Sequence, residues 1–231
     1  MLLLWPAPAA AQKRYSQSFQ TGQNIRLQLT NKTGTVTVEG WDRPVVSITA
    51  FLVTPAAEIR PQIVGDVILI DLVRDNSGRG TGDVNFTIRV PNTAKVDIET
   101  KIGNLKVSNV RSGLVRAHIT SEGDITLTNI VAATVSAENV TGDIFFDGEI
   151  VAGGNYRFAS MQGAINLRIP FPSNFKLKAT AYSTRSINLG PLTGSNLRYL
   201  GDGRQVIGQA GDGSAVIHVT NQRGVITFIT R

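Results

Sequence analysis

The chain contains no cysteine. This absence excludes a disulfide-stabilised scaffold, zinc or iron–sulfur sites with cysteine ligands, and a thiol nucleophile. Aromatic residues make up only 6% of the 231 residues, and charged residues only 17%. A core with so few rings has to be built from aliphatic side chains, many of them β-branched, which favours strands over helices.

Long apolar runs and long basic runs are also absent. A transmembrane helix needs about 20 consecutive apolar residues, and no stretch of the sequence reaches that length, so we expect no transmembrane segment. The net charge is +6, but the lysines and arginines are spread thinly. Nucleic-acid binders more often carry a basic cluster beside stacking aromatics. The charge therefore predicts no nucleic-acid partner and a mildly cationic surface that suits anionic surface polymers.

The first residues have the pattern of an export signal. Residues 1–11 form a short apolar run that ends in Ala9-Ala10-Ala11, and polar residues start at Gln12. This pattern is typical of the back half of a secretory signal peptide, with the front half lost to a misplaced start codon; the alternative is an apolar tail. We therefore expect an extracytoplasmic protein, located in the periplasm, at the cell surface or secreted.

Glycine is abundant, with 23 residues, and it accompanies many valines, isoleucines and threonines. Since glycine permits positive φ, this composition predicts many short strands joined by tight turns. Alternating apolar residues predict strands over 25–29, 34–40, 45–53, 67–73 and 86–90. Residues 190–213 are Gly-rich and are expected to form an irregular loop or a strand edge. Nowhere in the sequence do apolar residues recur at helical spacing beside a helix-capping residue, so we expect little or no helix. Residues 12–93 are predicted to form an N-terminal β region.

A repeat begins near residue 94. Its lead glycines, Gly103, Gly123, Gly142 and Gly163, are 20, 19 and 21 residues apart, and the second and fourth residues after each are apolar. A second strand of similar phase lies between successive glycines. A fixed period near 20 residues indicates a solenoid. We predict an all-β fold in which residues 94–231 form a short, parallel β-helix-like solenoid, with 12–231 as one continuous domain.

Residues between the inward apolar positions point outward, because strand side chains alternate between faces. The pattern places Lys106, Thr126 and Phe145 on one face and Arg116 and Arg157 on the other. These five residues are the predicted binding residues. Asn109 and Asn129, one period apart, are predicted to stack at a turn.

Few residues suggest catalysis or a cofactor, and we expect neither. Asp124 and Asp143 follow successive lead glycines, where a carboxylate pair could bind Ca²⁺ or cleave a polysaccharide, but Gly-Asp also suits a turn, which we favour. His118 and His218 occupy outward positions outside any nucleophile or metal motif. Trp41 could stack on a sugar ring, although capping the end of a core is the commoner role of such a residue.

Three stretches resemble a known family: Gly34 to Asp42, Val90-Pro91 leading into the Gly103 repeat, and the repeats that end at Gly224-Val225-Ile226-Thr227. Together they are similar to the DUF4097 family, or "putative adhesin" domain, of bacterial exported and envelope proteins, over most of residues 21–231. The resemblance implies a β-helix-like fold and a proposed role in adhesion. It supplies no catalytic residues.

The sequence thus predicts a non-enzymatic adhesin or scaffold of the cell surface or envelope, whose partner is a surface polysaccharide or an envelope protein. Two alternatives stay open. One is a polysaccharide-cleaving β-helix enzyme, a lyase or hydrolase, which would need clustered carboxylates. The other is a structural envelope module that binds a protein through a sheet edge or Phe145.

Overall fold

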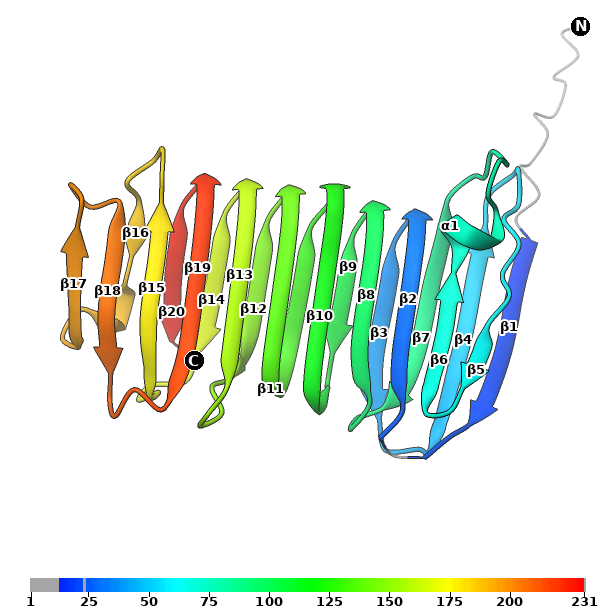
Figure 1. The fold of residues 1–231 in the computed structure, drawn as a ribbon, viewed down its shortest axis with the longest axis horizontal. Helices are drawn as coiled ribbons and strands as arrows, with labels where there is room; N and C mark the ends of the chain where they lie inside the picture. The colour runs from blue at the N-terminus through cyan, green and yellow to red at the C-terminus, as the bar shows by residue number, and fades with distance from the viewer. Residues whose placement is uncertain (1–12, 23, 231) are drawn as a thin grey trace, which may run out of the picture.

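The computed structural model describes residues 13–22 and 24–230, which fold almost entirely into strands (Figure 1). The strands are β1 (Lys13–Gln20), β2 (Arg26–Thr33), β3 (Val36–Trp41), β4 (Val45–Leu52), β5 (Gln62–Val64), β6 (Val67–Asp71), β7 (Val84–Pro91), β8 (Lys95–Ile102), β9 (Leu105–Ser108), β10 (Arg111–Glu122), β11 (Ile125–Thr141), β12 (Ile144–Glu149), β13 (Asn155–Gln162), β14 (Ile165–Ile169), β15 (Phe175–Ala181), β16 (Ile187–Asn188), β17 (Asn196–Leu200), β18 (Gln205–Ala210), β19 (Ala215–Arg223) and β20 (Ile226–Thr230). Within the described residues, helix is limited to one turn of α-helix, α1 (Leu72–Asp75), and one 3₁₀ turn, η1 (Gly190–Leu192). The prediction of an all-β chain with little helix is confirmed. The predicted signal segment, 1–11, lies outside the described residues.

The strands lie in two layers. In the front layer of Figure 1, parallel pairs run in the order β6-β2-β8-β10-β11-β13-β19-β15. In the back layer, parallel pairs run in the order β7-β3-β9-β11-β12-β14-β20-β16. The long strand β11 contributes its first half to the back layer and its second half to the front layer. We call these layers the front sheet and the back sheet.

The core lies between the sheets and follows from the alternation in the sequence. The positions two residues after the lead glycines, Leu105, Ile125, Ile144 and Ile165, are direct partners on neighbouring strands and are fully buried. Burial of each such side chain contributes about 1.5–3 kcal/mol. One cluster of buried residues extends from Ile25 to Phe228. It includes residues on both sides of the predicted boundary at 93/94, a boundary that stays a prediction.

The lead glycines stack into a column at one corner, which also includes Gly34 and Gly224. A Cβ placed on Gly103 would lie 2.3 Å from the carbonyl oxygen of Gly34, and one on Gly123 would lie 2.2 Å from that of Gly103. The same contact recurs from Gly142 to Gly123 at 2.2 Å, from Gly163 to Gly142 at 2.0 Å and from Gly224 to Gly163 at 1.7 Å. Only a residue without Cβ fits such an approach.

The spatial order of the strands departs from the sequence order at both ends of the stack. The C-terminal strand β19 lies between β13 and β15, where Figure 1 shows red between green and yellow, and β2 lies between β6 and β8. The glycine column gives a physical reason at the C-terminal end. Gly224 precedes β20 and fits against the Gly163 carbonyl, whereas Arg185 and Ser186 precede β16, which lies one place further out.

Antiparallel strands close the two ends. At the N-terminal end β4 pairs with β7, β1 with β4, and β5 with β6; at the other end β18 pairs with β15 and β17 with β18. Of the two alternatives expected for residues 190–213, an irregular loop or a strand edge, the structure has the strand edge, because β17 and β18 form a hairpin there. The strand expected over 67–73 ends early, at Asp71, because the Asp71 carboxylate accepts a hydrogen bond from the Arg74 amide at 2.9 Å and starts α1.

Candidate functional site

The outward side of the back sheet carries a row of mostly uncharged polar side chains. Successive cross-strand partners in this row, here named the back row, are Thr87, Thr37, Lys106, Thr126, Phe145, Asn166, Thr227 and Asn188. The row therefore brings together three predicted binding residues, Lys106, Thr126 and Phe145, at the strand spacing of about 4.8 Å. Lys106 is exposed and has no ion pair among the described residues.

Phe145 is the one aromatic side chain of the back row. The guanidinium of Arg168 lies 5.9 Å from its ring centroid and also donates a hydrogen bond to the buried Asp147 carboxylate at 2.6 Å. Hydrogen bonding to Asp147 raises the pKa of Arg168. Phe145 is half-buried and lies against a fixed cation, so it adds a small apolar surface to an otherwise polar row.

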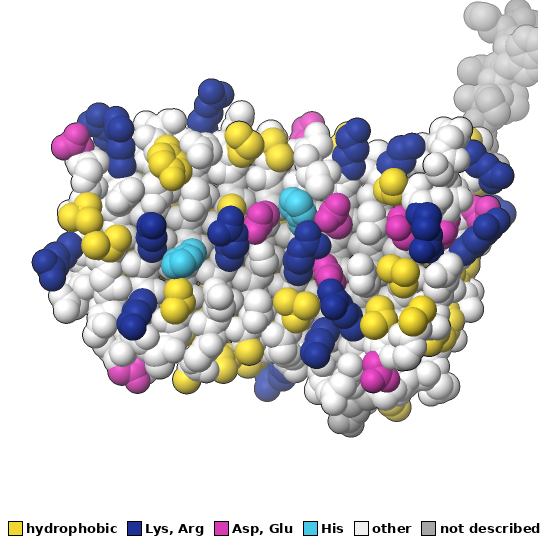
Figure 2. Space-filling model, in the orientation of Figure 1, with side chains coloured by type: hydrophobic (Ala, Val, Ile, Leu, Met, Phe, Trp, Pro, Cys, Tyr) yellow, Lys and Arg dark blue, Asp and Glu magenta, His cyan; other side chains and the backbone are white. Residues whose placement is uncertain are grey.

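The other two predicted binding residues, Arg116 and Arg157, lie on the front sheet beside acidic residues. Arg116 donates to Asp97 at 2.9 Å and to Glu99 at 3.1 Å, and Arg157 donates to Glu138 at 2.8 Å. Figure 2 shows this face, where basic, acidic and histidine side chains lie in line across the strands. The structure thus separates Arg116 and Arg157 from the back-row residues and pairs both with carboxylates of their own sheet.

These ion pairs alter the acid–base behaviour of the front sheet. Burial disfavours the charged guanidinium of Arg116, but the hydrogen bonds to Asp97 and Glu99 outweigh this effect and raise its pKa. Burial also opposes the charge of Glu138, yet the hydrogen bond from Arg157 lowers the pKa of that carboxyl below its ordinary value. Both arginines are committed to internal partners.

The two aspartates that follow lead glycines brace neighbouring turns. Asp124 Oδ1 accepts a hydrogen bond from the Asp143 amide at 2.8 Å, and Asp143 Oδ1 accepts one from the Ala164 amide at 2.7 Å. Asn104 Oδ1 likewise accepts a hydrogen bond from the Asp124 amide at 2.9 Å. Since each carboxylate binds backbone of the next turn, this geometry supports the turn interpretation over an acid–base pair.

Neither histidine lies in a recognisable catalytic group. His118 Nδ1 lies 3.3 Å from Glu99 Oε2 and 3.1 Å from Arg116, and His218 is exposed on the same row as Arg157. Within 13–22 and 24–230, no cluster of three or more histidine, aspartate and glutamate side chains is placed to hold a metal ion. In the same ranges, no helix has the length and apolar character to cross a membrane.

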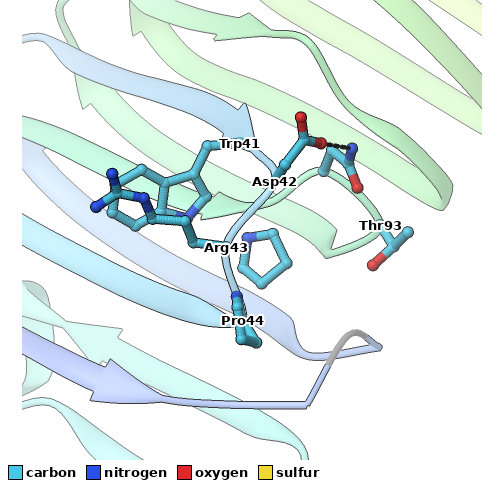
Figure 3. A pocket seen from close by; sticks show the side chains of 7 residues that line it. Trp41, Asp42, Arg43, Pro44 and Thr93 are labelled. Atoms are coloured by element: carbon cyan, nitrogen blue, oxygen red, sulfur yellow. Dashed lines mark hydrogen bonds between the residues drawn. The ribbon is translucent and has the colours of Figure 1, made fainter.

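A groove lies at the rim where the back-sheet strands β3, β7 and β9 end. It consists of two adjoining hollows of about 320 and 500 Å³ that share Trp41, Asp42 and Asn92. Arg43, Pro44, Pro91 and Thr93 complete the first hollow, and Gly40, Asn109, Arg111 and Asn129 complete the second. We name these eleven residues the rim groove. Figure 3 shows the first hollow, with Arg43 beside the Trp41 ring and a hydrogen bond from Asn92 to Asp42.

The sequence identified Trp41 and the Asn109–Asn129 stack but not the groove that they share. Asn129 Nδ2 donates to Asn109 Oδ1 at 2.8 Å, which confirms the predicted stacking. Asn92 and Arg111 were missed. Their only sequence signal is that each comes within a few residues of the end of a strand, as Trp41 does, and the parallel pairing brings these strand ends together.

Comparisons with known proteins agree with the architecture. The profile of the Toastrack DUF4097 family matches residues 27–227. A "putative cell adhesion protein" from Clostridium sporogenes has a similar structure, with 12% sequence identity, a TM-score of 0.57, and coverage of 96% of this chain and 100% of that one. No curated protein matches the chain.

Two further solved structures have lower scores. A "putative adhesin" from Bacteroides fragilis shares 11% identity at a TM-score of 0.31, with coverage of 96% and 99% of the two chains. A "putative lipid binding protein" from Parabacteroides distasonis shares 8% identity at 0.33, with coverage of 94% and 96%. The family profile covers most of the chain, so this protein belongs to the Toastrack DUF4097 family.

Proposed function

We propose that this protein is a non-enzymatic, extracytoplasmic adhesin or scaffold that binds surface polysaccharide through the back sheet. The strands form a short, solenoid-like stack whose rigidity keeps the outward rows straight over many strands. A long, regular face of this kind suits a polymer better than a small molecule, because each repeat of the polymer can meet a similar set of side chains.

One observation carries the proposal: Lys106, Thr126 and Phe145 lie side by side in a row in which Lys106 is exposed and unpaired within the described residues. A hydroxyl, an apolar ring and a free ammonium group are suited to the hydroxyl groups, C–H faces and carboxylates of an acidic glycan. The front-sheet cations Arg116 and Arg157 are less available, since a ligand would have to displace their carboxylate partners.

The experiment compares two matched charge reversals. The full chain is passed over immobilised alginate and over neutral dextran at low and high salt, together with Lys106→Glu and Lys178→Glu. Lys178 is an exposed lysine on the outward row of the front sheet. We expect salt-sensitive retention on alginate that is weakened in Lys106→Glu and unchanged in Lys178→Glu. Equal loss in both variants would assign the effect to net charge and would contradict a back-sheet site.

A second candidate function, docking of a protein partner, is favoured by the outer strand β17. Its only pairing within the described residues is with β18, and Tyr199 and Leu200 are 50% and 43% exposed. An unpaired edge can receive a strand from another chain. Proline substitution of Arg198 would block such pairing; if a stoichiometric partner from the native host still binds this variant, β17 is not the docking edge.

A further inference from the structure

The rim groove has the composition of a ligand site although no sequence motif marks it. It combines a tryptophan, two arginines, an aspartate and three asparagines at the ends of strands that are far apart in the chain. The groove depends on close backbone packing, because a Cβ on Gly40 would lie 2.0 Å from the carbonyl oxygen of Asn109. Asn109 and Asn129 both have positive φ, 59° and 54°, so the two turns repeat the same strained shape.

The charges of the groove are unbalanced. Arg43 and Arg111 are exposed and have no ion pair among the described residues. The carboxylate of Asp42 accepts a hydrogen bond from the Asn92 amide at 2.6 Å. The groove therefore contains two unpaired guanidinium groups and one carboxylate that already has an amide partner. This excess of positive charge favours an anionic ligand.

The tryptophan is fixed in orientation. Its Nε1 donates to the Val45 carbonyl oxygen at 2.8 Å, so the indole N–H is not available to a ligand. The guanidinium of Arg43 lies 5.2 Å from the Trp41 ring centroid, and that of Arg89, which is paired with Glu39 at 3.2 Å, lies at 5.6 Å. Trp41 thereby positions the unpaired Arg43 at the first hollow.

The asparagine pair offers matched polar groups. Asn129 and Asn109 share a single hydrogen bond. One side-chain NH2 group and one side-chain oxygen of the pair therefore have no partner in the described residues, whichever way the two amides are turned. Neighbouring donors and acceptors of this kind suit the hydroxyl groups of a sugar, each of which can donate and accept. A phosphate or sulfate ion would use the arginines but not the acceptor.

We propose that the rim groove binds a carboxylated saccharide. Arg111, with its planar fork of donors, pairs with the carboxylate. The asparagine pair binds ring hydroxyls, and the Trp41–Arg43 wall packs against the next unit of the chain. The inference extends the proposed polysaccharide binding to a second set of residues, distinct from the back row, and it names the class of sugar.

The test uses the fluorescence of Trp41. The chain has two tryptophans, Trp5 and Trp41, so the full chain with Trp5→Phe reports on the groove alone. This protein is titrated with oligogalacturonate, with a neutral oligodextran and with inorganic polyphosphate. We expect a saturable fluorescence change with oligogalacturonate only. Loss of a charge-assisted pair in Arg111→Gln should weaken binding by about 10- to 100-fold.

Arg204→Gln is the matched control, because Arg204 is exposed, unpaired among the described residues, and located at the β17–β18 end of the stack. It should bind as the parent does. Three outcomes would overturn the proposal: no fluorescence change with oligogalacturonate, equal weakening by Arg111→Gln and Arg204→Gln, or polyphosphate binding as tight as that of oligogalacturonate. Lys106→Glu in the same background separates the two sites: weakened alginate retention with unchanged fluorescence titration places the back row and the rim groove apart.

Discussion

Arg116 donates a hydrogen bond to Asp97 at 2.9 Å, across the parallel strands β8 and β10. The same carboxylate, only 10% exposed, also accepts a hydrogen bond from Arg26 on β2. One buried acidic group thus ties three neighbouring strands together. Arg116, which the sequence pattern predicted to be a binding residue, therefore forms an ion pair within the fold.

A double-mutant cycle on Arg116 and Asp97 should show coupling. We expect Arg116→Gln and Asp97→Asn each to lower the free energy of unfolding and the pair to couple by about 0.5–1 kcal/mol, because Arg116 is 38% exposed and solvent screens the interaction. Urea unfolding of the four proteins measures the coupling. A coupling free energy near zero would mean that the ion pair of Arg116 and Asp97 on the front sheet contributes specificity or solubility but no stability.

The pair of Arg157 and Glu138 should make stability depend on acid pH. Because the pKa of Glu138 is lowered in the folded chain, its ionised form stabilises the fold above the ordinary value of 4.5, and this contribution is lost as pH falls through the lowered value. We expect Arg157→Gln to cost about 0.2–1 kcal/mol at neutral pH and less in acid. Unfolding measured from pH 7 to pH 3, together with an NMR titration of the Glu138 carboxyl, checks the effect. An unchanged carboxyl titration in Arg157→Gln contradicts it.

Tyr156 should be a strong stabilising residue at the turn after β12. Its buried hydroxyl donates to the Ala132 carbonyl oxygen at 3.0 Å and accepts from the Val151 amide at 2.7 Å. Tyr156→Phe leaves both groups unpaired, so we expect a loss of about 1–3 kcal/mol. Tyr182→Phe, at a tyrosine that is 49% exposed, is the control and should change little.

The same hydroxyl predicts a response to alkali. Burial raises the pKa of Tyr156 above 10.0. The neutral hydroxyl therefore stabilises the fold fully below pH 10, and this contribution disappears as pH rises through the raised value. Burial also raises the pKa of Tyr15, so tyrosinate absorbance followed against pH should show two late-ionising tyrosines in the parent and one in Tyr156→Phe. An unchanged late amplitude in the variant would contradict the assignment to Tyr156.

The glycine column should tolerate no side chain. In Gly103→Ala the new Cβ would lie 2.3 Å from the Gly34 carbonyl oxygen, at a φ of +116°. We expect a loss of at least about 1–3 kcal/mol from backbone strain alone. Gly194→Ala, where a Cβ meets nothing within 4 Å, is the matched control. Thermal unfolding of both variants compares them, and equal midpoints would show that the column relaxes easily.

Two substitutions of Asp143 distinguish a structural role of this residue from a catalytic one. Asp143→Asn keeps the Oδ1 acceptor for the Ala164 amide, whereas Asp143→Ala removes it. We expect the asparagine variant to be nearly as stable as the parent and the alanine variant to lose about 0.5–1.5 kcal/mol. A reducing-sugar assay on acidic polysaccharides runs alongside. Turnover by the parent that Asp143→Asn loses would restore the enzyme alternative.

The sequence by itself determined the all-β class of fold and which residues of many strands face inward. Alternation and glycine spacing are local properties, since side-chain direction along a strand and the need for positive φ act over a few residues. For this reason the buried partners Leu105, Ile125, Ile144 and Ile165 and the outward Lys106, Thr126 and Phe145 could be assigned from spacing alone. The stacked Asn109 and Asn129 followed from the same period.

Only the tertiary structure decided which strands are neighbours and which charges are free. Strand order at the C-terminal end depends on whether the residue before a strand can pack directly against the carbonyl group of the neighbouring turn. Gly224 packs in this way against the Gly163 carbonyl, in space that a Cβ would otherwise fill. The ion pair of Arg116 with Asp97 and the groove shared by Trp41 and Arg111 bring together residues 19 and 70 positions apart. Which side chains end up together depends on which strands become parallel neighbours, and that is decided by the whole fold.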